Sequence, residues 1–163
     1  VLLAPSPGGG APAEVAKVFR RTLGGPAWLE KPVSCVPAVA DASSPAEFLV
    51  LCAESGTIGR LGLDPGGTAF AEALVPDRPE LLEAESLAGS PGGSDYAVLA
   101  PGRLLFGRIG EAFPSAAFSR SSALPALAAA SSFAWAAPGR LLVADGASRS
   151  LALFEFVDRS PLP

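Results

Sequence analysis

Short apolar runs separated by glycine, proline and polar turn residues make up most of the chain after position 32. Runs of this length between turn-forming residues are typical of β-strands, because helices need longer periodic segments. The pattern therefore predicts a mainly β protein. The predicted strands are Val33–Val39, Glu47–Glu54, Thr57–Leu63, Thr68–Val75, Tyr96–Ala100, Arg103–Ile109, Phe133–Ala136, Arg140–Ala144 and Ser150–Val157.

The N-terminal part contains one segment with a helical period. Apolar side chains between Ala13 and Leu23 recur at helical spacing, and Gly24 ends the pattern. The side chains on this face are Val15, Val18, Phe19 and Leu23. We expect a short helix that docks on the rest of the chain. Arg20 and Arg21 lie off that face, which leaves a membrane-surface or partner-binding helix as the alternative.

Four further segments have no clear period. Arg78–Leu87 is acidic and predicts a short helix or a surface loop, whereas Ala88–Ser94 has the composition of a linker. Ser122–Ser132 is Ala-rich and predicts a short helix or an irregular connection. Val1–Ala4 is either a first strand or the remainder of a targeting segment.

Two segments of the β-rich part share a sequence. Tyr96–Phe106 and Phe133–Val143 are offset by 37 residues (133 minus 96), and both contain Ala-Pro-Gly-Arg-Leu-Leu. A looser third copy begins at Phe48. In a Pro-Gly turn, proline presets φ at the first position and glycine accepts positive φ at the second. We therefore expect repeated β-hairpins, whose spacing of roughly 40 residues is typical of propeller blades.

The segment Phe133–Phe156 resembles one blade of the NHL and SMP-30-type β-propellers. Those blades continue from a first strand into a "dGrLyVaD" hairpin, a small polar turn and an outer strand. Leu141–Asp145, Ser148–Ser150 and Leu151–Phe154 take these places here, and Tyr96–Ile109 matches in part.

The resemblance implies a propeller, which needs at least about four blades, whereas this chain has room for about three. We therefore expect a propeller-like or partial propeller that other chain or a partner completes. A small β-sandwich, a barrel or an α+β fold is the alternative.

The composition removes several kinds of catalytic site. The chain contains no His, Asn, Gln or Met. It therefore cannot build a Ser–His–Asp or Cys–His arrangement, or a side-chain amide oxyanion hole. The metal site of SMP-30-like lactonases includes Asn, so the resemblance does not transfer that site. We predict no cofactor and no metal.

Carboxylates are the remaining catalytic groups. The candidates that could meet in space are Asp64, Glu72, Asp95, Glu111 and Asp145. Paired carboxylates can hydrolyse glycosides or bind Ca²⁺. Asp64 and Asp145 lie beside predicted turns, where Asp commonly caps its own backbone, and this is the simpler interpretation.

The two cysteines fall in successive predicted strands. A hairpin centred between Ser43 and Ser44 places Cys35 opposite Cys52, within the Cα separation that a disulfide needs. The alternative is two buried free thiols that pack as small apolar residues.

Charge and hydropathy limit the class of partner. The net charge is −4, and the closest basic residues are Lys17, Arg20 and Arg21. This is not the basic face that a nucleic-acid-binding protein needs, so we predict no nucleic acid. No apolar run reaches the roughly 18 residues of a membrane span, although peripheral association with a membrane complex stays open.

We expect an N-terminal extension over residues 1–32 and a β-rich repeat domain over residues 33–163. The expected function is a non-catalytic interaction or scaffold domain, as an accessory subunit of a larger organellar or exported assembly. The expected interface residues are Trp28, Phe19, Arg20 and Arg21, whereas Trp135 is expected in the core. The missing initiator Met favours an organellar or exported protein.

Two alternatives remain for the function. A carboxylate-based propeller hydrolase or lactonase would gather Asp95, Glu111 and Asp145 around one pocket. A β-domain that binds a lipid or pigment would contain a deep apolar pocket.

Overall fold

The structure is a computed structural model that describes residues 2–4, 13–16, 26–38, 47–64, 66–91, 95–114, 116–119, 130–146 and 148–155. Within these residues the chain forms thirteen strands and one short 3₁₀ helix, η1 (Pro79–Leu81). The predicted mainly β fold is confirmed, and each of the predicted strands is present. The sheets do not form a closed barrel.

Three antiparallel sheets follow one another along the sequence. The first sheet contains β3 (Pro32–Pro37), β4 (Glu47–Cys52), β5 (Thr57–Leu63) and β6 (Ala69–Val75) in this order. The second contains β7 (Ser86–Gly89), β8 (Asp95–Ala100), β9 (Arg103–Arg108) and β10 (Ala116–Ser119). The third contains β11 (Ala130–Ala137), β12 (Arg140–Asp145) and β13 (Ser150–Glu155).

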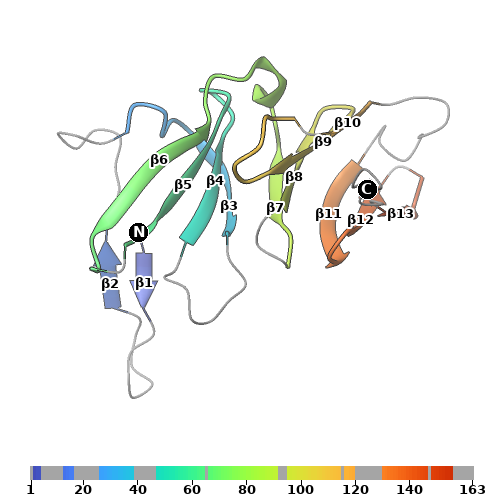
Figure 1. Cartoon of the computed structure of the whole chain (residues 1–163). Coiled ribbons are helices and arrows are strands. Elements are labelled where there is room, and N and C mark those ends of the chain that lie inside the picture. Colours follow the sequence, from blue (N-terminus) through green and yellow to red (C-terminus); the bar gives the residue numbers. More distant parts are fainter. Residues whose placement is uncertain are drawn as a thin grey trace, which may run out of the picture.

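The second sheet lies between the other two (Figure 1). Successive residues of β8 point to opposite faces, so Tyr96 and Val98 join a core with the first sheet. Ala97 and Leu99 join a second core with the third sheet. Because both faces of β8 are covered, its sequence is a continuous apolar run rather than an alternating one.

Strand β7 holds the three sheets together, because β3 and β11 both lie against it. The Ser34 hydroxyl donates to the Leu87 carbonyl at 3.3 Å and accepts from the Leu87 N–H at 3.2 Å. From the third sheet, Trp135 Nε1–H donates to the Ala88 carbonyl at 3.1 Å. A Cβ at Gly89 would lie 2.7 Å from the Pro37 carbonyl oxygen, so the glycine permits the close approach of β3.

Both predicted Pro-Gly hairpins are confirmed. β8 pairs with β9 from Ala100 opposite Arg103, and β11 pairs with β12 from Ala137 opposite Arg140. Gly102 has φ of +66° and Gly139 has φ of +72°, as the turn prediction requires.

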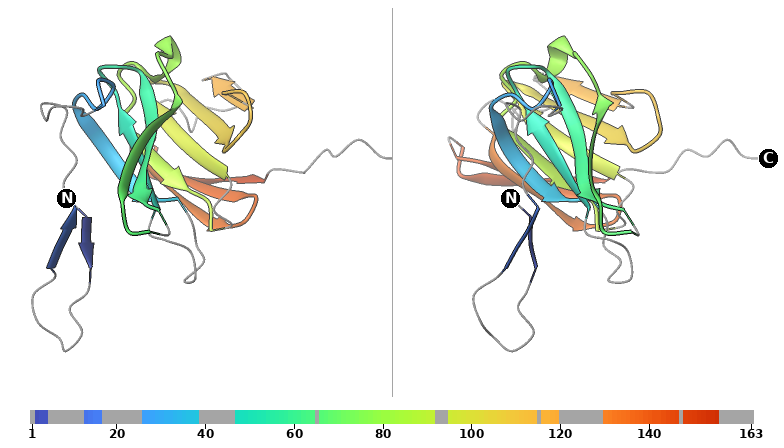
Figure 2. Two further views of the ribbon diagram at one scale, coloured as in Figure 1. Left: turned by 60° about the vertical axis from the view of Figure 1, so that its left-hand side comes forward. Right: turned by 90° about the vertical axis from the view of Figure 1, so that its left-hand side faces the viewer.

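The predicted helix over Ala13–Leu23 is wrong where the structure describes it. Ala13–Ala16 is strand β2, which pairs with β1 (Leu2–Ala4). In both views of Figure 2 this pair lies apart from the three larger sheets. The apolar spacing of this segment also fits a helix, but its backbone N–H and C=O groups are paired with those of β1. Residues 17–23 lie outside the described residues.

The predicted disulfide is also wrong, because the register of the first hairpin differs from the expected one. Cys35 lies opposite Val50, and Cys52 lies opposite Pro32 across a strand irregularity. Both cysteines are free thiols, Cys35 exposed and Cys52 buried. The connection between β3 and β4 is long, and its turn residues do not determine the centre of the hairpin.

Candidate functional site

The most unusual surface of the described chain is the side of the third sheet that faces away from the second sheet. Along β12, Leu141 and Val143 point into the core, whereas Leu142 points outward. Leu142 lies opposite Leu153 of β13, and Ala144 lies opposite Leu151. Leu142 is 37% exposed, Leu153 53% and Leu151 72%. We call these three side chains, with the exposed Ala134 of β11 beside Leu142, the leucine face.

One ion pair lies at the end of the leucine face. Arg140 and Glu155 are cross-strand partners on β12 and β13, with 3.0 Å between Arg140 Nε and Glu155 Oε1. Both side chains are exposed, so the pair adds little to stability. The pair itself adds no net formal charge to this end of the leucine face.

The opposite end of the stack is different, because Trp28 covers part of it. A Cβ at Gly59 of β5 would overlap the Trp28 ring, so the indole lies directly on the backbone of the first sheet. The Ser55 hydroxyl donates to the Trp28 carbonyl at 2.8 Å and fixes this segment. Val50 and Cys52, on strand β4 of this sheet, are buried. Trp28, predicted as an interface residue, therefore packs within its own chain.

A cavity of about 350 Å³ opens between β6 and the adjoining ends of β8 and β9. Tyr96 lines it, although only 1% of the residue is exposed. The Tyr96 ring stacks on Phe113, with 5.9 Å between ring centroids, and lies over Gly107, where a side chain would overlap it. Burial raises the pKa of Tyr96 to about 12, so its hydroxyl stays a neutral donor at ordinary pH.

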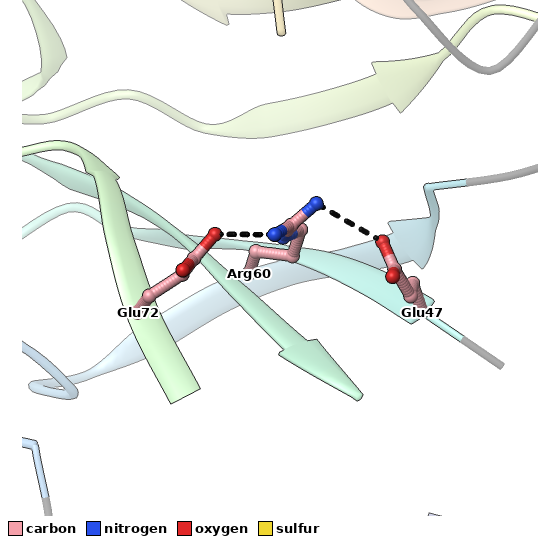
Figure 3. Close-up of polar contacts among 3 residues, drawn as sticks. All are labelled: Glu47, Arg60 and Glu72. Carbon is pink, nitrogen blue, oxygen red and sulfur yellow. Dashed lines mark hydrogen bonds and ion pairs between the residues drawn. The ribbon is translucent and has the colours of Figure 1, made fainter. Parts of the chain in front are cut away.

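Charged side chains beside this cavity pair with one another. Figure 3 shows Arg60 between two carboxylates, 2.6 Å from Glu72 and 3.4 Å from Glu47. Arg108 similarly lies 2.7 Å from Asp95 and 3.5 Å from Glu111. Glu72, Arg108 and Glu111 line the cavity, which makes its entrance polar.

The predicted carboxylates do not come together as one group. Asp95 and Glu111 meet through Arg108, but Asp145 is buried in the third sheet, where its Oδ1 accepts from the Ser148 N–H at 3.2 Å. Asp64 accepts from the Thr68 N–H at 2.8 Å. Both Asp64 and Asp145 therefore cap their own turns, as the simpler interpretation predicted. Within the described residues no three His, Cys, Asp or Glu side chains lie close enough to hold a metal ion.

Of the remaining residues that the sequence singled out, the structure describes one. Trp135 is in the second core, as predicted, in an edge-on contact with Phe106 at 6.3 Å between ring centroids. Phe19, Arg20 and Arg21 lie outside the described residues.

The sequence predictions missed the leucine face. Its signal was the unbroken apolar run Leu151-Ala152-Leu153-Phe154, which is typical of a strand covered on both faces.

Comparisons with known proteins add no family to this description. No protein-family model matches the chain, and a search of curated proteins found no significant match. Among the described residues, no helix has both the length and the apolar character needed to cross a membrane.

Proposed function

We propose that this chain is a non-catalytic β-rich interaction module and that the leucine face binds its protein partner. The observation that carries the proposal is the exposure of Leu142, Leu151 and Leu153 on one sheet face. The largest contiguous apolar patch on a protein surface is often a functional one, and such patches commonly mark interaction sites. The sequence of β13 is that of a covered strand, so a partner would complete the layer.

The shape and charge of this surface favour a protein. A sheet face is broad and flat, so it suits a partner of similar shape better than a small molecule, which needs a concave site. Arg140 and Glu155, the charged cross-strand pair at the end of this face, neutralise each other. An anionic membrane surface would instead be matched by several unpaired basic residues.

The order of the sheets supports a propeller-like arrangement as part of the same proposal. The second sheet stacks on the first and the third on the second, and β7, the first strand of the second sheet, adjoins both β3 and β11, the first strands of the other two. Successive antiparallel sheets arranged in this way are typical of propeller blades. An accessory subunit of a larger assembly would use the open third sheet as its contact.

A site-specific cross-linker tests the proposal. We would place a photoreactive amino acid at position 151 and, as a control, at Leu82, which is 45% exposed beside η1. Irradiation in an extract of the source cells is expected to give a defined product from position 151 alone. Leu153→Asp should abolish that product, and the identified partner should bind the purified chain. Equal products at both positions would reject the proposal, and so would the absence of a product from position 151 in a chain that also does not self-associate.

The Tyr96 cavity supports a second candidate, a small polar ligand. Its charged lining and its volume do not suit a lipid or pigment, the ligands considered from the sequence. The Tyr96 hydroxyl and the carboxylates of Glu72 and Glu111 could instead bind hydroxyl or amino groups. Glycerol and ethanolamine are minimal probes, and NMR shift changes that Tyr96→Phe removes would support this candidate. No shift near Tyr96 with either probe would reject it.

A further inference from the structure

The leucine face has the properties that a sheet needs to pack on a copy of itself. Its centre is formed by cross-strand neighbours of β12 and β13, with Leu142 opposite Leu153 and Leu151 opposite Ala144. These are aliphatic side chains of moderate size on a regular antiparallel sheet. Two such faces can interdigitate at the usual sheet-to-sheet spacing of about 10 Å.

The charges beside this face match those of an identical face. Arg140 and Glu155 are one positive and one negative side chain, 3.0 Å apart on neighbouring strands. In a contact between identical surfaces, a two-fold axis relates the Arg140–Glu155 pair of one copy to the same pair of the other, with the order of the two charges reversed. The basic side chain of one copy can then approach the acidic side chain of the other, and no uncompensated charge is buried.

Face-to-face stacking of sheets is already how this chain builds its two cores. The first sheet packs on the second through Leu49, Leu51 and Val98, among others. The second packs on the third through Leu104, Phe106 and Leu141. The third sheet presents further leucines on its free side, so another sheet can pack there face to face. A two-fold contact differs from the two internal cores in that it pairs two identical faces.

We propose that a second copy of this chain stacks its leucine face on this one and forms a two-fold symmetric dimer. The inference rests on the proposed function, because it identifies the partner of the same surface. The dimer joins two stacks of three sheets through their third sheets, and the ends covered by Trp28 point outward.

The size of the face indicates a weak dimer. Three strands of about six residues span about 14 Å by 20 Å, because strands lie ~4.8 Å apart and rise ~3.3 Å per residue. Two such faces bury on the order of 600 Å² in flat projection, which is about half of the ~1,200 Å² at the lower end of stable interfaces. We therefore expect concentration-dependent association rather than a permanent dimer.

Sedimentation equilibrium of the full chain measures this association. Samples from about 10 µM to about 500 µM cover the affinities expected of an interface of this size. The wild-type mass should rise from monomer toward dimer over this range. Leu151→Asp, at the most exposed position of the face, should keep the protein monomeric, whereas the control Leu82→Asp should dimerise as the wild type does. Dimerisation that persists in Leu151→Asp would overturn the inference.

Charge reversal tests whether identical faces meet. Arg140→Glu leaves two acidic side chains beside the face, and Glu155→Arg leaves two basic ones. Each variant alone should dimerise at least about tenfold more weakly, because like charges across an interface repel. An equimolar mixture of the two variants should associate more tightly than either alone. A mixture that behaves as the average of its components would count against the face-to-face dimer.

The cross-linking experiment separates failure of this inference from failure of the proposed function. A product from position 151 with twice the mass of the chain supports the dimer. A product with a different protein overturns the dimer but retains the interaction module. A chain that is monomeric at every concentration and gives no product from position 151 overturns both.

Discussion

The hairpin of β8 and β9 and the hairpin of β11 and β12 share the sequence Ala-Pro-Gly-Arg-Leu-Leu but lie in different layers. In the first hairpin, Leu104 enters the second core and Leu105 enters the first core, so both side chains are buried. In the second hairpin, Leu141 is buried, but Leu142 lies on the open leucine face. The same two leucines therefore have different environments because one hairpin has a sheet on each side.

A strand irregularity adds a second difference between the hairpins. The pairing of β11 with β12 shifts between Trp135 and Ala137, so Leu141 pairs with Trp135. In the other hairpin no shift occurs, and Leu104 pairs with Leu99. The extra residue lies in β11, between Trp135 and Ala137. Because neighbouring residues on a strand face opposite sides, matching positions of β12 and β9 then point to opposite faces of their sheets. Local sequence thus specifies the hairpin, whereas register and layer position specify which leucine is exposed.

The largest expected effect comes from truncating the matched leucines. Leu105→Ala removes a side chain that is 1% exposed and should lower the free energy of unfolding by about 2–5 kcal/mol. Leu142→Ala, at the matching position, should cost less than about 1 kcal/mol in dilute solution, because its side chain already contacts water. Urea denaturation of both variants measures the difference. Equal losses would mean that the two leucines are equally covered.

A smaller loss is expected from Gly107→Ala, at the position that Ala144 occupies in the other hairpin. A methyl group at Gly107 would overlap the Tyr96 ring, so the core must shift. Overpacking of this kind typically costs about 1–3 kcal/mol. Thermal unfolding of Gly107→Ala beside Ala144→Gly would compare the two positions. If Gly107→Ala unfolds at the same temperature as the wild type, the Tyr96 ring does not restrict this position and the expected difference between the two hairpins is wrong.

Trp135→Phe is expected to weaken the attachment of the third sheet. The substitution removes the hydrogen bond to the Ala88 carbonyl and part of the ring that contacts Phe106. The expected loss is about 1–2 kcal/mol, since the carbonyl loses its partner and some apolar contact is lost. Hydrogen exchange should show faster opening in β11–β13 than in β4 and β5. A uniform change over all sheets would contradict a local attachment.

The smallest expected effect is on the pH dependence of stability. Tyr96 can titrate, whereas Phe133, at the matching position of the other hairpin, cannot. The folded pKa of Tyr96 is raised to about 12 from 10, so the folded state holds this proton more tightly than the unfolded state. The resulting stability is complete below pH 10 and is lost as pH rises toward 12. Between pH 10 and 11 the expected loss is roughly 1 kcal/mol.

Tyr96→Phe is the matched control, because Phe cannot titrate. Denaturation at pH 9, 10 and 11 should show a shallower alkaline decline in this variant than in the wild type. Parallel declines would mean that Tyr96 is not responsible. Cys52, whose pKa burial raises to about 11, contributes in the same direction in both proteins.

Much of the strand pattern could be predicted, because it depends on local composition. Thr57–Leu63 has the predicted bounds, and the Pro-Gly turns have the expected glycine conformation. β7 was missed because Ser86-Leu-Ala-Gly89 contains one large apolar residue and no period. It forms a strand through its pairing with β8 and through Ser34, both distant in sequence.

The candidate site could not be predicted in the same way, because exposure depends on layers and register. The apolar run of β13 indicated a covered strand, but nothing local distinguishes Leu142 from Leu105. The predicted Cys35–Cys52 pairing was wrong for a related reason. Val50, rather than Cys52, lies opposite Cys35, and this register is set by the long connection between β3 and β4 and not by the residues beside the cysteines. The position of Asp64 and Asp145 beside predicted turns did anticipate that both would cap those turns.

The positions of the two tryptophans give the protein an optical label at each end of its stack. Trp28 lies on the outer side of the first sheet, and Trp135 lies between the second and third sheets. The chain contains no other tryptophan, so Trp28→Phe and Trp135→Phe each leave one emitter that reports on one end. Fluorescence can thus follow the leucine-bearing layer and the Trp28-covered layer separately in the same molecule, without any added dye.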